Sequence, residues 1–176
     1  MGAQDEPKNP TEIFKNPGRL KQQLEKFKQF HDQKTAGIPG LCPLYVGMPG
    51  RVTEKIIHAK NKDIVILKHT SFEVVGWDLH PADRQRVPGG ERYLHYLPLC
   101  IYVKFAKAKW KIHRDLDQGV FPLHPLVREW TLKNETQSKV KRRGYTVVPD
   151  FASTAFMAQG ETLIAELADC GTSPYN

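Results

Sequence analysis

The spacing of apolar residues divides the chain into one helical stretch followed by a series of short strands. Between residues 19 and 31, apolar side chains recur at intervals of three and four, which places them on one face of an amphipathic helix. Glycine and proline at residues 37–40 end this stretch. Beyond residue 41 the apolar runs are short and alternate with polar positions, as expected for strands that bury one face.

Five or more short strands are predicted between residues 41 and 138. The clearest covers residues 97–105, and one of its faces carries Leu99, Ile101, Val103 and Phe105. The others cover residues 41–46, 51–53, 64–67, 72–77, 109–113, 120–123 and 127–132. Turns rich in glycine, proline and aspartate join them, which is typical of a small β-barrel. Residues 1–17 are polar, contain three prolines and show no period, which predicts a disordered tail ahead of a helix and linker at residues 18–40.

The net charge of +7 is unevenly distributed along the chain. Residues 104–143 contain eleven lysines and arginines and four acidic residues. Residues 144–176 contain four acidic residues and no lysine or arginine. A basic centre beside an acidic end indicates an anionic partner for the centre. The alternative is a solvated, highly soluble face without a specific partner.

The sequence lacks the residue patterns of a self-contained enzyme. It has no Gly-x-x-x-x-Gly-Lys-(Ser/Thr) loop to hold phosphates, and its histidines and acids have no nucleophile at a recognisable offset. The three cysteines lack zinc-binding spacing, and the seven histidines include no i,i+4 pair suited to a metal. We therefore expect no catalytic residue, no metal site and no cofactor in this chain.

The sequence also bears on the compartment in which the protein works. No apolar run approaches the ~20 residues that span a bilayer, and the N-terminal residues lack the apolar centre of a signal peptide. The cysteines stand in apolar contexts, as buried thiols of a reducing compartment do. These features predict an intracellular protein without a membrane partner.

A nonapeptide near the C-terminus carries the most specific signal. Residues 154–162 are Thr-Ala-Phe-Met-Ala-Gln-Gly-Glu-Thr and follow a predicted strand at residues 145–148. This stretch resembles the C-terminal motor motif of superfamily 1B DNA helicases, the RecD-like and Pif-like group, which is Thr-x-His-Lys-(Ser/Ala)-Gln-Gly-x-Thr-Leu. The matching positions are Thr154, Ala158, Gln159, Gly160, Thr162 and Leu163. Phe156 and Met157 stand where the family has His and Lys.

Three further segments resemble the same family, in the family's order. Residues 44–53 are Leu-Tyr-Val-Gly-Met-Pro-Gly-Arg-Val-Thr and resemble the start of an SH3-like barrel that the family inserts into its second motor domain. Val-Val-Gly-Trp at residues 74–77 resembles an internal strand, and the Arg-Arg and proline of residues 142–149 resemble the return. The resemblance implies a mixed α+β fold with an N-terminal helix, an SH3-like β-barrel at residues 41–138 and a partial RecA-like α/β closing segment at residues 139–176.

The same resemblance implies a function. The chain would be the C-terminal, DNA-tracking portion of an ATP-dependent DNA helicase without its ATPase core. ATP and Mg²⁺ would serve only the full-length protein, and the missing motor domain would act in cis or in trans. Thr154 would contact a DNA phosphate, Phe156 would stack on a sugar or base, and Gln159 with Gly160 would lie at the nucleotide cleft. Two alternatives stay open, namely a non-enzymatic SH3-like module that binds nucleic acid or protein through a basic face, and an inert gene fragment.

The basic residues at 139–143 are predicted to form the main phosphate-contacting stripe. They lie at the barrel's return, where the family's DNA track passes. Because side chains alternate along a strand, Lys139, Lys141 and Arg143 would point one way and Arg142 the other. Each phosphate contact would release counterions. We expect single-stranded DNA as the partner, with RNA as a second candidate.

A second group of candidate contacts surrounds Trp110. Lys109 and Lys111 flank this tryptophan and can meet phosphates, while its indole ring could stack on an unpaired base. Trp77 and Trp130 are predicted to lie in the barrel core, where a large ring contributes most to packing. The sequence leaves the role of Trp110 open.

Overall fold

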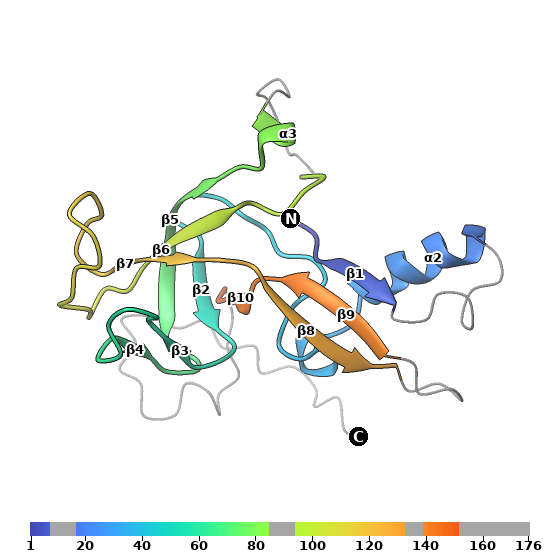
Figure 1. Cartoon of the computed structure of the whole chain (residues 1–176), viewed down its shortest axis with the longest axis horizontal. Coiled ribbons are helices and arrows are strands. Elements are labelled where there is room, and N and C mark those ends of the chain that lie inside the picture. Colours follow the sequence, from blue (N-terminus) through green and yellow to red (C-terminus); the bar gives the residue numbers. More distant parts are fainter. Residues whose placement is uncertain (8–16, 85–93, 133–138, 152–176) are drawn as a thin grey trace, which may run out of the picture.

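The computed structural model describes residues 1–7, 17–84, 94–132 and 139–151, which form three antiparallel sheets and two α-helices (Figure 1). The largest sheet has five strands in the order β10 (Val147–Pro149), β2 (Pro49–Val52), β5 (Ser71–Asp78), β6 (Cys100–Lys104) and β7 (Val120–Leu123). The second sheet has the order β1 (Gln4–Pro7), β9 (Lys139–Gly144) and β8 (Leu126–Thr131), and the third contains β3 (Ile56–Ile57) and β4 (Val65–Ile66). The helical elements are α2 (Pro17–Lys28), α3 (Pro81–Arg84) and the 3-10 helix η1 (Asp32–Thr35).

The main hydrophobic core joins the five-stranded sheet to the β3–β4 hairpin. Strand β5 shows how the core forms. Its residues alternate, so that Phe72 and Val74 are buried whereas Ser71 and Glu73 are exposed. Its buried strand residues are Val52, Ile66, Phe72, Val74, Ile101, Val103, Phe121, Leu123 and Val147. The alternation of apolar and polar residues that predicted strands from the sequence therefore also determines which side chains lie in this core.

A second, smaller core joins α2 to the sheet of β1, β9 and β8. Phe27 on α2 is 1% exposed and packs edge-on against Trp130 of β8, with 5.2 Å between the ring centroids. Val140 of β9 completes the buried group. Leu24 and Phe30 pack against this group and stay partly exposed. The apolar face of the helix is thus covered by a sheet other than the one that carries the main core.

The predicted fold class, an SH3-like barrel with a partial RecA-like α/β segment, is wrong for the described residues. They are mostly β, and their sheets are open. A barrel closes only when each strand has two neighbours, whereas β10 and β7 are the two edges of the five-stranded sheet. After β7 the chain continues into β8, which belongs to another sheet, and so it does not return to close a barrel.

The start of the predicted RecA-like segment also differs. An α/β segment would place helices against parallel strands, but β9 and β10 pair antiparallel with strands of two different sheets. Strong β-propensity at residues 145–148 predicted a strand without revealing which sheet it would join. Residues 152–176, which hold the nonapeptide, lie outside the described residues.

The first residues of the chain take part in the fold, in contrast to the predicted tail at residues 1–17. Gln4–Pro7 forms β1, which pairs with β9 and places Asp5 opposite Arg142. Ala3 is 8% exposed, and its N–H donates to the carbonyl of Gly40 at 2.8 Å. A short polar stretch that ends in proline has little β-propensity, so the sequence pattern did not predict this strand. Residues 8–16 lie outside the described part.

Several predicted elements shift their bounds. The helix predicted at residues 19–31 begins at Pro17, because proline fits the first helical position, where no N–H bond is lost. Residues 41–46 and 109–113 are irregular instead of extended strands. The strand predicted at residues 97–105 is shorter, and Leu99 outside it is 43% exposed. Among the described helices, none combines the length and the apolar character needed to cross a membrane.

Candidate nucleic-acid interface

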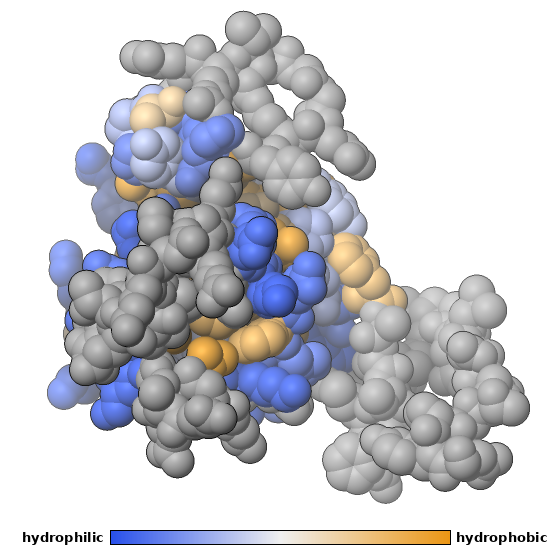
Figure 2. All heavy atoms as spheres, turned by 90° about the vertical axis from the view of Figure 1, so that its right-hand side faces the viewer, coloured by the Kyte–Doolittle hydropathy of each residue, from blue (hydrophilic) through white to orange (hydrophobic). Residues whose placement is uncertain are grey.

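Strand β9 carries the basic residues that the sequence assigned to the main phosphate stripe. Its side chains alternate between solvent and interior, so that Lys139, Lys141 and Arg143 are exposed while Arg142 is buried. The side of the molecule that bears α2, β1, β8 and β9 is largely hydrophilic over its described surface, with small apolar areas between the polar residues (Figure 2). The predicted division of the four cations into two faces is therefore present in the structure.

Acidic residues on both neighbouring strands reduce the positive charge of this stripe. Lys141 lies opposite Glu6 of β1 and opposite Glu129 of β8. Side chains directly opposite each other in antiparallel strands have their Cβ atoms about 4.5–5.5 Å apart, close enough for opposite charges to attract. Lys139 and Arg143 lie opposite uncharged residues on β8, Thr131 and Val127. Two carboxylates therefore offset much of the charge that three cations would present to a phosphate backbone.

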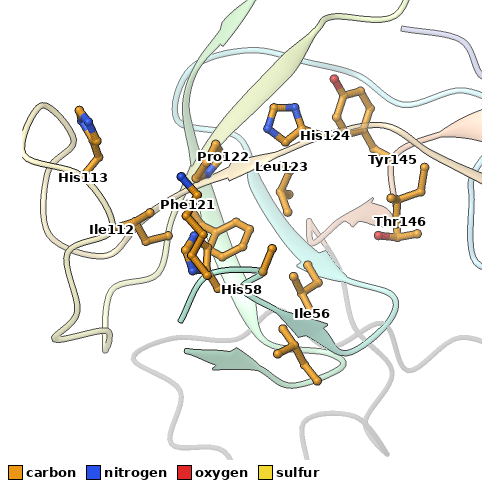
Figure 3. A pocket seen from close by; sticks show the side chains of 14 residues that line it. Ile56, His58, Ile112, His113, Phe121, Pro122, Leu123, His124, Tyr145 and Thr146 are labelled. Atoms are coloured by element: carbon orange, nitrogen blue, oxygen red, sulfur yellow. The ribbon is translucent and has the colours of Figure 1, made fainter. Parts of the chain in front are cut away.

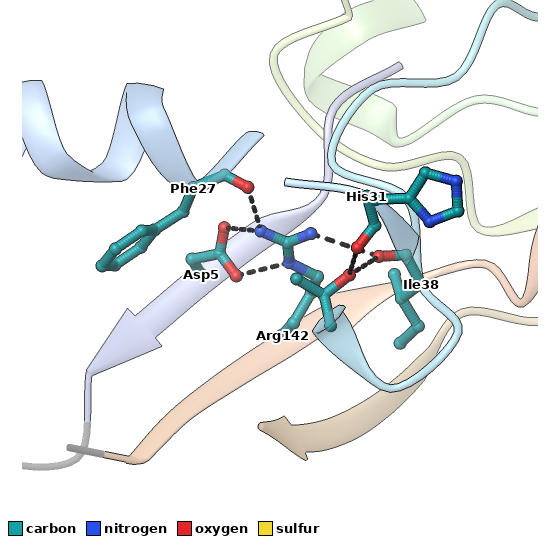
Figure 4. A network of polar contacts seen from close by, with 6 residues as sticks. Asp5, Phe27, His31, Ile38 and Arg142 are labelled. Atoms are coloured by element: carbon teal, nitrogen blue, oxygen red, sulfur yellow. Dashed lines mark hydrogen bonds and ion pairs between the residues drawn. The ribbon is translucent and has the colours of Figure 1, made fainter. Parts of the chain in front are cut away.

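Arg142 is part of the interior and is not exposed to a ligand. Its side chain has no exposed surface, and its Nε and Nη2 donate to the two carboxylate oxygens of Asp5 at 2.7 and 2.8 Å (Figure 4). Nη1 donates to the carbonyl of Ile38 at 3.1 Å, and Nη2 also donates to the carbonyl of Phe27 at 2.6 Å. The guanidinium lies 5.5 Å from the ring centroid of Trp130, as in a cation–π contact. Arg142 thus connects β9, β1, α2 and the segment after η1.

The loop between β6 and β7 presents cations with fewer acidic neighbours. The eleven residues 104–114 contain five basic residues and no acidic one. Lys107, Lys109 and Lys111 are all exposed, and the side chain of Arg114 is 89% exposed. Lys104, at the start, lies opposite Glu73 of β5. Beyond the loop, Asp115 lies 3.6 Å from Arg114. The unopposed charge of this loop therefore centres on the three lysines.

Trp110 holds this loop against the core. Its ring is partly buried, and its centroid lies 6.1 Å from those of Phe105 and Phe121. The carbonyl of Trp110 accepts a hydrogen bond from the N–H of Gly119 at 2.9 Å, which ties the middle of the loop to its C-terminal end. Lys109 and Lys111, on either side of the tryptophan, are exposed. The structure thus packs Trp110 against the core and leaves it partly exposed between two exposed lysines.

A hollow of about 480 Å³ lies beside this loop and adds polar groups to it. Lys107, Trp110, His69 and Arg51 are among its lining residues. Arg51 is already paired, since its Nε donates to Asp150 at 2.7 Å. His69 has a φ of 68°, a left-handed conformation that is uncommon outside glycine. The hollow borders both the loop and β4, and apolar residues such as Val65 and Leu67 line it together with these polar ones.

The other sequence-predicted residues fall into two groups. Trp77 is partly buried against the main core, and Trp130 lies in the second core beside α2 instead of in a barrel. Thr154, Phe156, Gln159 and Gly160 lie outside the described residues. Asp5 was not among the predicted residues, because it lies in the stretch expected to be a tail. The opposite charges of Asp5 and Arg142 allow an ion pair, but no pattern in the sequence indicates that two residues so far apart in the chain are in contact.

Within the described residues, the segments that resemble the helicase family perform packing roles. Gly47 has a φ of 84° and donates its N–H to the carbonyl of Val74, so the turn into β2 requires a glycine. Met48 is 1% exposed in the main core. A Cβ on Gly50 would lie 2.5 Å from the ring of Phe72. These residues therefore specify how the chain enters the sheet.

Comparison with known proteins yields one structural likeness and no sequence relative. No protein-family model matches the chain, and no curated protein matches its sequence. The fold is similar to part of a crystal structure of Pif1 helicase from Candida albicans, with 14% sequence identity and a TM-score of 0.44. The likeness covers 93% of this chain and 31% of that one. At this level it establishes neither membership of a family nor an activity.

The described residues do not provide a site for metal or thiol chemistry. They include no group of three or more histidine, cysteine, aspartate or glutamate side chains placed to hold a metal ion. Burial raises the pKa of the Cys42 and Cys100 thiols to about 11. A thiol with such a pKa is protonated at neutral pH, and the thiolate is the reactive form. These two cysteines therefore act as small core residues.

Proposed function

We propose that the chain is a DNA-contacting part of an ATP-dependent DNA helicase, without the ATPase core and inactive as a motor alone. The order of the four helicase-like segments supports the family assignment. The observation that carries DNA contact is the exposed loop at residues 104–114, where five basic residues occur without an acid. The expected ligand is single-stranded DNA, with RNA as the second candidate.

The loop suits contact with phosphates better than recognition of bases. Lys107, Lys109 and Lys111 are exposed on a segment that Trp110 anchors to the core. Ammonium groups neutralise phosphates and release counterions whatever the sequence of the nucleic acid. The β9 stripe would be a weaker contact, because Glu6 and Glu129 compete for its lysine at 141. Binding should therefore depend strongly on salt and weakly on sequence.

A steady-state ATPase assay tests the absence of motor activity. The 176-residue chain has no phosphate-binding loop, and transfer of a phosphoryl group requires one with its lysine and Mg²⁺. We expect the same phosphate release as from a heat-denatured sample, with or without single-stranded DNA. Turnover that DNA stimulates above this control would contradict the proposal that the chain lacks the ATPase core.

A second candidate is a nucleic-acid-binding module that works without any motor. The loop favours it, because its cations and their anchor all belong to this chain. A transcript that carries a phosphate-binding loop upstream of these residues would support the helicase assignment. If the chain binds DNA in a salt-sensitive way and its transcript encodes no phosphate-binding loop, the assignment as a nucleic-acid-binding module without a motor is supported.

A further inference from the structure

An apolar groove opens where the five-stranded sheet fails to close. It lies between β7 and the β3–β4 hairpin and has a volume of about 530 Å³ (Figure 3). We call it the β3–β7 groove. His113 lies at one end and Tyr145 with Thr146 at the other, and Phe121 and Ile56 lie between them (Figure 3). The groove does not include the lysines of the proposed DNA contact at 107, 109 and 111.

The lining of the groove is mainly aliphatic and aromatic. Its apolar residues include Ile56, Ile57, Ile112, Phe121, Leu123 and Leu126. Ile57 is 53% exposed and Leu126 is 37% exposed, so part of this surface is in contact with water. Covering such surface is favourable by about 25 cal/mol per Å². An apolar concavity of this kind indicates a binding surface for apolar side chains.

Three polar residues at the rim, His58, Lys60 and His113, can donate hydrogen bonds into the groove, and no acidic residue of the described part of the chain lines it. The fourth, His124, uses its Nδ1 to donate to the carbonyl of Leu99 at 3.2 Å. The Nδ1 atoms of His58 and His113 accept backbone N–H groups at 3.0 and 3.3 Å. In a neutral imidazole the proton is then on Nε2, which is a donor. Asp115 lies 3.4 Å from Nδ1 of His113 but is not part of the lining. The rim therefore complements carboxylates.

The shape and chemistry of the groove select among kinds of occupant. Pro122 in the middle of β7 has no N–H, so this edge is poorly suited to strand addition by a peptide. Lys60 is the one lysine among the described residues that line the groove, whereas a nucleic-acid site would present several cations.

We propose that the β3–β7 groove binds a short amphipathic helix of a partner protein. Three apolar anchors, at i, i+4 and i+7, would lie in the groove, as in other helix-in-groove complexes. Carboxylates beside these anchors would meet Lys60, His58 and His113 at the rim. The groove and the proposed DNA contact share one loop, because Ile112 and His113 line the groove. Binding of the helix does not require binding of DNA.

Fluorescence anisotropy with a designed peptide tests this site on the full chain. The probe is a fluorescein-labelled helical peptide of alanine and glutamate with leucines at i, i+4 and i+7. Its control is the same peptide with lysine in place of each glutamate. The protein variants are Ile57→Glu and Leu126→Glu in the groove, with Val46→Glu as the matched control, since Val46 is 64% exposed and outside the lining. Circular dichroism verifies that each variant is folded.

The proposal predicts a specific pattern of affinities. The native chain and Val46→Glu should bind the acidic peptide equally, and each groove variant should bind it roughly tenfold more weakly, because like charges then oppose each other. The lysine peptide should bind more weakly than the acidic one. Absence of saturable binding below about 1 mM, or equal binding by the groove variants, would overturn the proposal. Displacement of the peptide by an oligonucleotide that persists in Lys107→Ala/Lys109→Ala/Lys111→Ala, or self-association that Ile57→Glu abolishes, would assign the groove to nucleic acid or to a second copy and would equally overturn the proposal.

Discussion

At the scale of single residues, the pair of Asp5 and Arg142 connects the N-terminal strand to the rest of the fold. Both side chains are buried, with 2% and 0% exposure. Removing one partner of such a pair leaves an uncompensated charge in the interior, which typically costs about 3–5 kcal/mol. We expect Asp5→Ala to lower the free energy of unfolding by this amount in urea denaturation.

The neighbouring residue provides a control for this prediction. Glu6 is exposed on the same strand, and its replacement by alanine should change the free energy of unfolding by less than about 1 kcal/mol. If Asp5→Ala and Glu6→Ala destabilised the protein equally, the buried pair would not have the structural role assigned to it here.

Tyr145 should make stability depend on alkaline pH. Its ring is 3% exposed, its hydroxyl donates to the carbonyl of Pro98 at 2.7 Å, and burial raises its pKa above the usual value. A raised folded-state pKa contributes stability that is complete below the unfolded pKa of about 10 and is lost as pH rises through the folded pKa. Tyr145→Phe should therefore destabilise the protein by about 1–3 kcal/mol at pH 8 and by less above pH 10.

Urea denaturation at both pH values measures this difference. The exposed Tyr45 gives the control variant Tyr45→Phe, for which we expect no comparable change between the two conditions. A cost of Tyr145→Phe that stays constant with pH would show that ionisation of this hydroxyl is not linked to folding.

At the scale of elements, helix α2 is held mainly by Phe27. This ring is 1% exposed and contacts Trp130 and Phe30. Truncation of a buried phenylalanine typically costs about 3–5 kcal/mol, so Phe27→Ala should lower the melting temperature strongly. Leu24 is only partly buried, and Leu24→Ala should cost less. The exposed Lys26 supplies a control, and a Phe27→Ala variant as stable as Lys26→Ala would mean that the helix is undocked.

Local pattern predicted elements well where a single period governs them. The alternation at residues 139–143 correctly separated Arg142 from its neighbours, because a strand has no other way to arrange successive side chains. The apolar spacing of α2 predicted the face that carries Leu24 and Phe27. The bounds were less accurate, because helix ends and strand ends depend on partners distant in sequence.

At the scale of the whole molecule, the sequence did not predict how the sheets assemble. The strands within residues 41–138 were expected to close a barrel and residues 139–176 to form a RecA-like segment. Instead β8 pairs with β9, and β9 pairs with β1, which was expected to be a tail. The pairing of β9 with β1 includes the buried contact of Asp5 with Arg142. These two residues are 137 positions apart, so no local pattern reveals their contact. The same pairing changes the candidate site, because it moves one cation inside and brings Glu6 beside Lys141.

The charge distribution is the property of the whole molecule on which the proposed function depends. The sequence placed the strongest contact at residues 139–143, whereas the acids of β1 and β8 now favour the loop at residues 104–114. From each surface, three exposed cations can be removed without touching a core residue. The two triple variants therefore lose the same charge, and each serves as the control for the other.

The most direct test measures binding of a labelled single-stranded oligonucleotide by fluorescence anisotropy at several salt concentrations. It compares the native chain with Lys107→Ala/Lys109→Ala/Lys111→Ala and with Lys139→Ala/Lys141→Ala/Arg143→Ala, two variants with the same net charge. The log–log slope of affinity against salt should flatten by about 0.7 for each phosphate that the variant no longer neutralises. We predict a change of about 2 for the loop variant and less than half of that for the β9 variant. Equal slopes for the native chain and the loop variant, or a larger change for the β9 variant, would contradict the account.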